Sequence, residues 1–260
     1  MNRLTIVKVG GKVVEDPKSL NNFISEFKQI SGSKILIHGG GTSATKLASK
    51  LGIETKMIEG RRITDAKMLD VVVMVYAGLI NKNIVSKLHV VGCNAAGFTG
   101  ADLDLIRAKK RQHPEIDYGL VGDIEDVNTL ELRLLLEEAV VPVIAPITHD
   151  GNGQLLNTNA DTIASEIAKE FSNYYNVYLL YCFEKSGVLK DQKNEKSVIP
   201  HLDYNTFSNL KENGIIASGM IPKLENGFYA KRNGVKEVII TNTSNLATGK
   251  GTRLQLEIKQ

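Results

Sequence analysis

Residues 35–43 read Ile35-Leu36-Ile37-His38-Gly39-Gly40-Gly41-Thr42-Ser43. The three apolar residues at the start predict a short buried strand, and residues 44–48 after the glycines have a helical composition. A strand that passes through glycines into a helix can bind an anion, because glycine N–H groups can approach it closely and the helix N-terminus attracts negative charge. A second turn of this kind, Gly10-Gly11, ends a predicted strand at residues 4–9 that carries Lys8. The function has to account for both turns.

The order of elements around these turns predicts the fold class. Residues 17–30 have apolar side chains at helical spacing and a strand at 34–37 follows, so the chain begins β-α-β-α. This alternation is typical of an α/β protein with a mostly parallel central sheet flanked by helices. Further strands are expected at 140–146, 177–181 and 237–241, and helices at 65–80, 128–138, 162–171 and 220–233. The run Asn-Tyr-Tyr-Asn at 173–176 is expected to separate two domains, residues 1–173 and 174–260.

Composition limits the function. The chain has 260 residues, 42% of them hydrophobic, which is enough for one large α/β domain or two small ones. The net charge is +3, and the one tight basic cluster, residues 107–111, is interpreted as a solvated helix end, so no nucleic-acid partner is expected.

Cys93 and Cys182 match no metal-binding spacing and are expected to be buried free thiols of a cytoplasmic protein. No signal peptide precedes the first strand, and the longest apolar run, residues 71–80, is about half of the roughly 20 residues that a membrane helix needs.

The glycine turns taken singly have more than one explanation. An ammonium group such as that of Lys8 can reach a phosphate held by a glycine turn, but a lysine at a strand edge is also ordinary. Gly39-x-Gly41-x-x-Ala44 fits the dinucleotide-binding fingerprint, with Glu59 about 20 residues further on as a ribose-binding acid. This pattern favours an NAD(P)-binding oxidoreductase, but that alternative leaves Lys8 and the second glycine turn unexplained.

Three further stretches carry polar groups that could form a site. Asn157-Thr158-Asn159-Ala160-Asp161 leads into a helix, and a plain cap needs only one such residue. Lys223 falls in the first turn of a predicted helix, where a cation is unfavourable, and such a violation is expected of a functional residue. Arg61-Arg62 could clamp a carboxylate through bidentate bonds, or could be two solvated arginines in a turn.

In this order and spacing, the motifs resemble the amino acid kinase family over nearly the whole chain, and within it the branch that acts on acetylglutamate. The pieces that carry the resemblance are Val7-Lys8-Val9-Gly10-Gly11, His38-Gly39-Gly40-Gly41, Gly60-Arg61-Arg62-Ile63-Thr64, Gly78 with Asn81-Lys82, Val121-Gly122-Asp123-Ile124, Leu156-Asn157-Thr158-Asn159-Ala160-Asp161, Gly219-Met220-Ile221-Pro222-Lys223 and Gly249-Lys250-Gly251-Thr252. The third and the sixth of these pieces indicate that branch.

The resemblance implies a three-layer fold with two lobes. Residues 1–173 would bind an acyl amino acid and form a homodimer, and residues 174–260 would bind the nucleotide. The implied reaction is ATP-dependent transfer of the γ-phosphoryl group to the side-chain carboxylate of an N-acyl-L-glutamate, N-acetyl-L-glutamate above all, in arginine biosynthesis. Because that carboxylate is already ionised at neutral pH, no general base is required, and catalysis consists of positioning and charge neutralisation.

The resemblance also implies roles for single residues. Lys8 and Lys223 would neutralise the transferring phosphoryl group, and Asp161 would orient both lysines. The residues implied to bind the nucleotide are Gly10, Gly11, Gly40 and Lys223, and those implied to bind the acceptor are Gly40, Gly41, Arg62 and Asn157. Mg²⁺ is expected to arrive with ATP and to be held mainly by phosphates and water, with no metal site built of protein ligands.

The chain departs from the family pattern after the strand at 177–181. The run Tyr181-Cys182-Phe183-Glu184-Lys185-Ser186-Gly187-Val188 is longer than the family's turn and lacks its Asp, so the contacts to adenine and ribose stay unassigned. The acyl group also stays open, because an apolar pocket discriminates imperfectly against added groups, and a bulkier acyl such as succinyl is an alternative. A non-catalytic amino-acid sensor on the same fold is another, against which Lys8, Lys223 and Asp161 argue.

The expected assembly is a homodimer that does not respond to arginine. Family members inhibited by arginine resemble one another in an extra N-terminal helix, for which Met1 leaves no room before the strand at residues 4–9. The helix at 65–80 is apolar nearly all round over residues 71–77, as if one side faced the sheet and the other a partner subunit. Cover by neighbouring elements of the same domain explains this run equally well.

Overall fold

Alternation in the first strand sets up the two faces of the central sheet. In β1 (Arg3–Val9), Leu4 and Ile6 belong to one buried cluster, and Val7 and Val9 belong to a second cluster on the opposite face. A strand that is apolar on both faces has to be covered on both. The computed structural model describes residues 1–58, 61–216 and 218–256.

The described residues form a central sheet of eight strands, in the order β12-β14-β13-β11-β1-β2-β8-β5. The bounds of the other seven strands are β2 (Ser33–His38), β5 (Ala95–Phe98), β8 (Val141–Ile144), β11 (Asn176–Phe183), β12 (His201–Asp203), β13 (Glu237–Asn242) and β14 (Thr252–Gln255). Every neighbouring pair is parallel except β13 and β14. The predicted α/β class with a mostly parallel sheet is confirmed.

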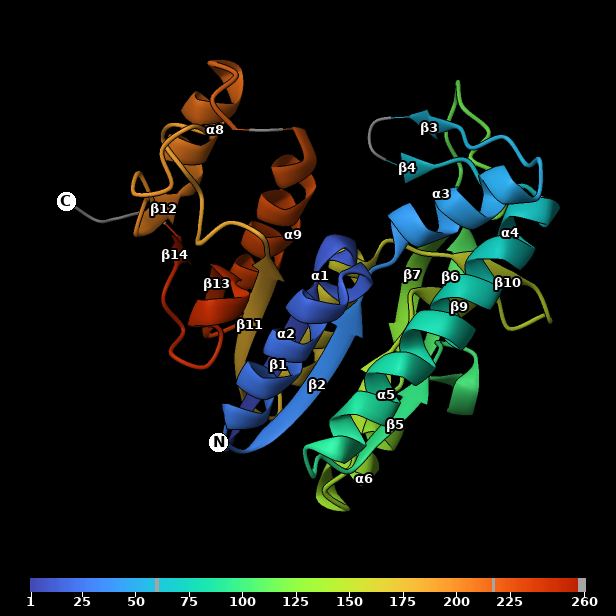
Figure 1. Ribbon diagram of the computed structural model, residues 1–260, viewed down its shortest axis with the longest axis horizontal. Coiled ribbons are helices and arrows are strands. Elements are labelled where there is room, and N and C mark those ends of the chain that lie inside the picture. The colour runs from blue at the N-terminus through green and yellow to red at the C-terminus, as the bar shows by residue number, and fades with distance from the viewer. Residues whose placement is uncertain (59–60, 217, 257–260) are drawn as a thin grey trace.

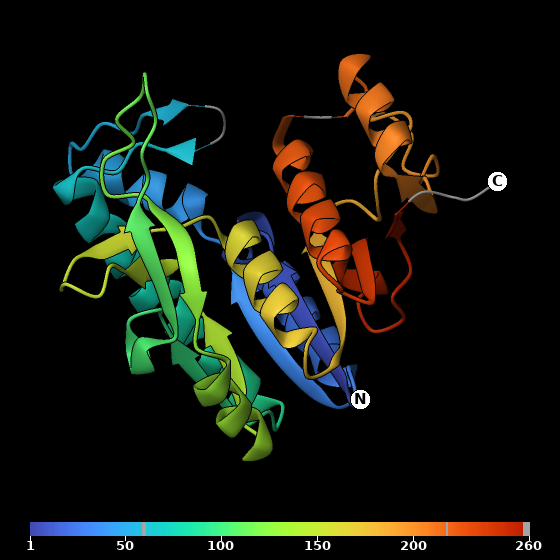
Figure 2. The same cartoon turned by 180° about the vertical axis from the view of Figure 1, so that it is seen from behind.

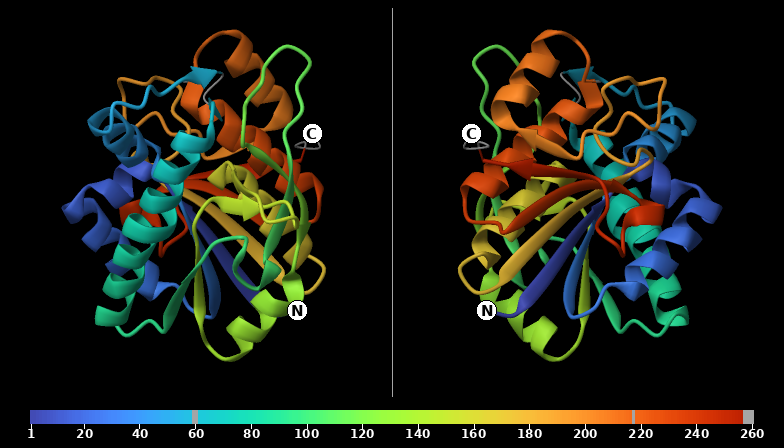
Figure 3. Two further views of the ribbon diagram at one scale, coloured as in Figure 1. Left: turned by 90° about the vertical axis from the view of Figure 1, so that its right-hand side faces the viewer. Right: turned by 90° about the vertical axis from the view of Figure 1, so that its left-hand side faces the viewer.

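Helices cover both faces of this sheet and make three layers (Figure 1). The helices on the face of Val7 are α1 (Gly11–Glu15), α2 (Pro17–Gln29), α3 (Gly41–Lys50), α4 (Ala66–Val73) and α5 (Asn81–Val90). The helices on the face of Leu4 are α6 (Thr129–Glu137), α7 (Ala160–Phe171), α8 (Tyr204–Glu212) and α9 (Ile221–Arg232). Figure 2 shows α7 and α9 from their own side, and Figure 3 shows the layers from the two sides of the molecule.

A smaller sheet in the order β10-β9-β6-β7 contains the basic cluster. Its strands are β6 (Ile106–Lys110), β7 (Gly122–Val127), β9 (Ile147–His149) and β10 (Leu155–Asn157). The interpretation of residues 107–111 as a helix end is therefore wrong. Ile106 and Ala108 are buried while the basic side chains between and after them point outward, next to the acidic residues of β7. Lys109 lies 3.3 Å from Glu125, so the cluster is balanced by its neighbours.

The elements α4, η1 (Met74–Ile80, a π-helical segment) and α5 form one continuous helix of 25 residues. Asp65 caps it by accepting a hydrogen bond from Met68 N. By length and composition alone this helix could cross a membrane, and half of its most apolar 18-residue window is buried inside the protein. Met74 and Leu79 lie on its outer side, with exposed fractions of 52% and 67%.

The central sheet brings both glycine turns to one place. β1 and β2 are parallel neighbours in its middle, so the turns that follow them lie side by side at the carboxyl ends of the strands. Strands β11 to β14 lie on one side of β1, and β2, β8 and β5 lie on the other. The boundary at residue 173 falls between α7 and β11 and stays a prediction. Cys93 and Cys182 are free and buried, as expected.

Candidate active site

The two glycine turns are in backbone contact with each other. Gly39 N donates to Val9 O over 3.0 Å, and Gly10 N donates to Cys182 O over 2.9 Å. A Cβ built on Gly39 would lie 3.2 Å from Gly11 N, and one built on Gly11 would lie 3.3 Å from Gly40 N. These separations are tighter than ordinary contacts, so the approach of the turns favours glycine at these positions.

The side chains of Lys8, Asp161 and Lys223 contact one another beside the glycine turns. Lys8 Nζ lies 2.8 Å from Asp161 Oδ1, and Lys223 Nζ lies 3.2 Å from Asp161 Oδ2. The three come from β1, from the first turn of α7 and from the first turn of α9. Packing of α7 on α9, where Ser165 Oγ and Asn226 Oδ1 are 3.1 Å apart, helps to hold the two helix starts together. One carboxylate between two lysines leaves a positive charge.

Burial and pairing set the protonation of this group. Burial on its own would raise the pKa of Asp161, but the ammonium groups of Lys8 and Lys223 outweigh it, and its pKa lies below the ordinary value. Burial lowers the pKa of Lys8, and Asp161 opposes that shift. Asp161 is therefore ionised at neutral pH. It cannot act as a general acid there, and its carboxylate can instead orient both lysines.

Asn159 rather than Asp161 caps α7. Its side-chain Oδ1 accepts hydrogen bonds from Asp161 N, over 2.7 Å, and from Thr162 N, over 3.2 Å. Asn157 instead donates from Nδ2 to Thr64 Oγ1 over 3.0 Å. Of the alternatives left open for residues 157–161, the helix cap is confirmed at Asn159, and the functional site stays a prediction for a stretch that lines one cavity.

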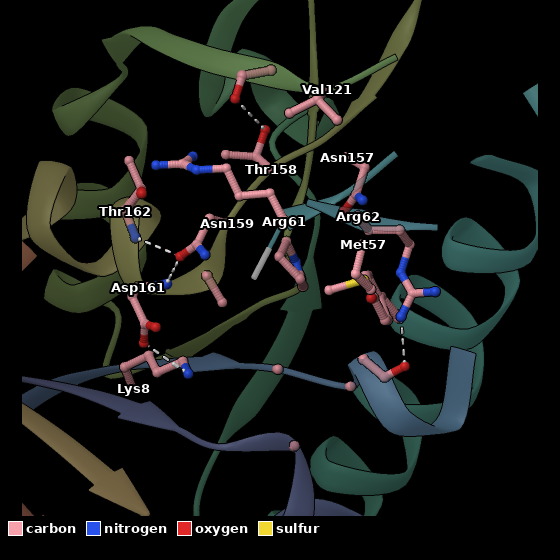
Figure 4. A pocket seen from close by; sticks show the side chains of 18 of the residues that line it. Lys8, Met57, Arg61, Arg62, Val121, Asn157, Thr158, Asn159, Asp161 and Thr162 are labelled. Atoms are coloured by element: carbon pink, nitrogen blue, oxygen red, sulfur yellow. Dashed lines mark hydrogen bonds and ion pairs between the residues drawn. The ribbon is translucent and has the colours of Figure 1, made fainter. Parts of the chain in front are cut away.

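A cavity of about 300 Å³ lies between this charged group and Arg62 (Figure 4). Lys8 and Asp161 line one side of it, and Arg62, from β4 (Arg61–Arg62), lines the other. Arg62 Nη2 donates to Gly41 O over 2.8 Å and to Thr45 Oγ1 over 2.9 Å, which fixes the guanidinium group against α3. The predicted residues Gly11, Gly40, Gly41, Asn157 and Lys223 also line the cavity.

A second cavity, of about 500 Å³, lies on the other side of the lysines. It extends over Gly10, Gly11 and the segment from Phe183 to Gln192, and it reaches Met220 at the start of α9. Lys8, Gly11 and Lys223 line both cavities. Two molecules bound in the two cavities would therefore meet at the lysines.

Three residues of the site carry no motif in the sequence. Tyr76 and Arg111 line the first cavity, and Glu15 accepts a hydrogen bond from Ser43 N over 2.8 Å beside the glycine turns. They lie in η1, one residue after β6 and at the end of α1, so only the tertiary fold brings them to the site. A Cβ on Gly40 would lie 2.4 Å from Ile80 Cδ1 and 3.0 Å from Tyr76, so η1 packs directly on the second turn.

The oxidoreductase alternative rested partly on Glu59, which lies outside the described residues. Gly60, of the hairpin motif, also lies outside them, although β3 (Met57–Ile58) and β4 on either side do pair antiparallel. The described part of the fingerprint, Gly39 to Ala44, forms a strand-to-helix turn. That turn borders a cavity with five basic residues, Lys8, Arg61, Arg62, Arg111 and Lys223.

Comparisons with known proteins agree on the family. The model of the amino acid kinase family matches residues 3–242. A protein named acetylglutamate kinase from Parabacteroides distasonis is 54% identical, over 98% of this chain and 100% of that protein. Carbamate kinase from Giardia lamblia bound to AMP-PNP has the same fold, with a TM-score of 0.70 at 15% identity over 98% of this chain and 99% of that one. N-acetylglutamate synthase from Neisseria gonorrhoeae gives a TM-score of 0.84 at 20% identity, over 98% of this chain and 60% of that one. The chain belongs to the amino acid kinase family.

Proposed function

We propose that the chain is an ATP-dependent kinase that phosphorylates the side-chain carboxylate of N-acetyl-L-glutamate, in arginine biosynthesis. One observation carries this proposal: the two cavities share Lys8, Gly11 and Lys223, with Asp161 between the lysines. A phosphoryl group passed from one cavity to the other would cross this point. Relatives that are 54% identical over nearly the whole chain and are named acetylglutamate kinase support the same reaction.

The reaction needs charge neutralisation rather than proton transfer. An oxygen of the acceptor carboxylate attacks the γ-phosphorus of ATP, the bond from that phosphorus to the bridging oxygen breaks, and ADP leaves with the electron pair. Lys8 and Lys223 neutralise the oxygens of the transferring group and of the leaving phosphate. Asp161 is a positioning residue, because its carboxylate lies 2.8 Å and 3.2 Å from the two ammonium groups.

The first cavity is the acceptor site in this proposal. Arg62 binds the α-carboxylate, Asn157 binds the substituent side of the α-carbon, and the amides of Gly40 and Gly41 bind the carboxylate that is phosphorylated. Bonds from Nη2 to Gly41 O and Thr45 Oγ1 hold the guanidinium group of Arg62 in place, so a carboxylate would bind its other donors or replace one of these two bonds. An acceptor placed this way directs its side chain toward Lys8.

The second cavity is the nucleotide site. The amides of Gly10 and Gly11, with Lys223, bind the phosphates, joined by Gly40 from the first cavity, and the base lies against the segment after β11. In that segment Glu184 lies 3.2 Å from Lys12, so this carboxylate is already paired. Mg²⁺ supplies further charge neutralisation and is held mainly by ATP phosphates and water.

A second acceptor, N-succinyl-L-glutamate, is favoured by the charge of the first cavity. Arg61 and Arg111 line this cavity in addition to Arg62. Arg111 pairs with Asp123 through two of its nitrogens and lies over the ring of Tyr118. The terminal carboxylate of a succinyl group would share Arg111 with Asp123, whereas an acetyl group carries no charge to place beside these arginines.

A panel of acceptors tests whether the enzyme phosphorylates N-acetyl-L-glutamate or N-succinyl-L-glutamate. We expect ADP release from ATP and Mg²⁺ with N-acetyl-L-glutamate or with N-succinyl-L-glutamate, and none with free L-glutamate. If succinyl is preferred, Arg111→Leu lowers kcat/KM for the succinyl substrate by about tenfold or more and leaves the acetyl substrate unaffected, because one charged contact is lost. The matched control is Arg107→Leu, four residues earlier in β6 and paired with Asp104 instead. Binding of NADH without any ADP release would favour the oxidoreductase.

We also propose a soluble cytoplasmic homodimer in which residues 1–173 bind the acceptor and residues 174–260 bind the nucleotide. The exposed Met74 and Leu79 of η1 support a two-fold contact along the helix that contains them. The order of strands in the sheet supports the division into halves, because the described strands after residue 174, β11 to β14, lie on one side of β1.

A further inference from the structure

Glu15 connects the two glycine turns of the site. It is the last residue of α1, a helix that begins at Gly11 in the first turn. Its Oε1 accepts a hydrogen bond over 2.8 Å from Ser43 N, the third residue of α3, which begins at Gly41 in the second turn. The same oxygen lies 3.5 Å from where a Cβ on Gly11 would be. One side chain therefore reaches from the first turn to the second.

We infer that Glu15 is a positioning residue that fixes the spacing between the nucleotide phosphates and the acceptor carboxylate. This inference rests on the proposed function, in which the first turn binds phosphate and the second binds the acceptor. The turns also touch through backbone atoms, at the hydrogen bond from Gly39 N to Val9 O and where Gly11 packs against Gly40. A charge-assisted hydrogen bond from Glu15 to the start of α3 adds a side-chain link to this contact, beyond the ends of the two strands.

The carboxylate also changes what the start of α3 can bind. The first N–H groups of a helix attract anions. Glu15 occupies Ser43 N, so a substrate carboxylate or phosphate cannot use that donor and is directed to the glycine amides and lysines. Displacements of about 1 Å between reacting groups can reduce rates about a hundredfold, so small movements of the turns matter.

The adjacent residue offers a matched control. Asp16 also caps a helix with its carboxylate, accepting a hydrogen bond over 2.7 Å from Ser19 N at the start of α2. It lines neither cavity and lies one residue from Glu15. Asp16→Ala thus removes a helix cap without touching the turns, whereas Glu15→Ala removes the link between them.

The experiment measures kcat and both KM values for the wild type, Glu15→Ala, Glu15→Gln and Asp16→Ala. We expect Glu15→Ala to lower kcat about tenfold or more, with both KM values within about twofold, because each substrate still binds but their spacing is lost. Glu15→Gln keeps an acceptor oxygen at the same length and should recover most of kcat. Asp16→Ala should keep kcat. Equal kcat in Glu15→Ala and Asp16→Ala would overturn the inference.

Amide hydrogen exchange without substrates separates this inference from the proposed function. In Glu15→Ala the first turn of α3 should exchange faster than in the wild type, and in Asp16→Ala it should not. Unchanged exchange in Glu15→Ala would overturn the inference whatever the activity. A wild type that releases no ADP with any acceptor would instead speak against the proposed function.

Discussion

The charges of the site depend on where single residues lie along their elements. Lys8 is even-numbered, like Leu4 and Ile6, so it points to the face of the sheet that carries α7. Asp161 and Lys223 each lie in the first turn of a helix that packs on that face. Three elements far apart in sequence thus place one carboxylate between two ammonium groups.

The lysines give the most direct test at this scale. We expect Lys8→Ala and Lys223→Ala each to lower kcat by a factor on the order of 10², because each removes a donor to the transferring charge. The KM for the acyl-glutamate should change little, and steady-state kinetics with ATP in excess would measure both. Near-normal kcat in either variant would contradict the roles proposed for the lysines.

His38 gives a pH-dependent stability. It is fully buried, and burial lowers its pKa to about 4. Its ring nitrogens lie 3.0 Å from Gly39 O and 3.2 Å from Asn81 Nδ2, so the neutral ring is part of the fold. In the unfolded chain the imidazole takes up a proton first as the pH falls. The stabilisation that depends on the neutral ring is therefore fully present at pH values above the pKa that His38 has in the unfolded chain. It is lost as the pH falls from that value to the pKa in the folded protein.

Between pH 8 and pH 5 this effect should remove about 2 kcal/mol of the free energy of unfolding. Urea unfolding of the wild type and of His38→Asn at both pH values would measure it. The variant is expected to lose less stability over this interval, whatever its stability at pH 8. An identical loss in both proteins would show that His38 does not titrate as its burial requires.

At the scale of elements, the sequence predicted the helices and strands whose apolar residues recur at a clear spacing. The spacing of apolar residues identified α2, and Lys223, marked by its violation of helix preference, lies in the first turn of α9 beside Asp161, while its function stays a prediction. β6 was missed, because a five-residue strand with three basic residues shows little apolar alternation. Glu15 and Tyr76 were missed for another reason: their place beside the turns depends on contacts between distant elements, which leave no local pattern.

The packing of η1 on the second glycine turn leads to a double-variant test. Gly40→Ala would bring a Cβ to 2.4 Å from Ile80 Cδ1, so we expect it to cost about 1–3 kcal/mol of stability and to lower kcat. Ile80→Val removes that Cδ1 atom, and the double variant should recover part of both losses. Chemical denaturation and kinetics of the wild type, the two single variants and the double variant would complete this double-mutant cycle. If the losses of the two single variants add up to the loss of the double variant, η1 does not set the position of Gly40.

At the scale of the whole molecule, the two cavities meet at residues contributed by both halves of the chain. Lys8 and Gly11 come from the first half, and Lys223 comes from the second. Binding in both cavities should therefore draw the halves together. Small-angle scattering should show a smaller radius of gyration with AMP-PNP and acceptor together than with either alone. An unchanged radius would indicate that the site is already closed without ligands.

Assembly can be tested through the exposed side of η1. We expect light scattering to give a dimer for the wild type, and Leu79→Glu to give a monomer, because a buried unpaired charge opposes association. Leu130→Glu, at a comparably exposed leucine of α6, should leave the dimer intact. If Leu79→Glu is still a dimer, the interface lies elsewhere. If the wild type is a monomer, the proposed interface does not exist.

The middle position of β1 also has a consequence for synthesis. Its neighbour β2 follows closely in the chain, but its other neighbour is β11, where Arg3 pairs with Asn176. At about 5–20 residues per second, the ribosome needs on the order of ten seconds or more to deliver that strand. Throughout this time β1 presents an open, apolar edge to the surroundings, and such edges recruit other chains. Nascent chains stalled before residue 176 should therefore aggregate far more readily than the finished protein, and a chaperone that covers β1 should raise the yield.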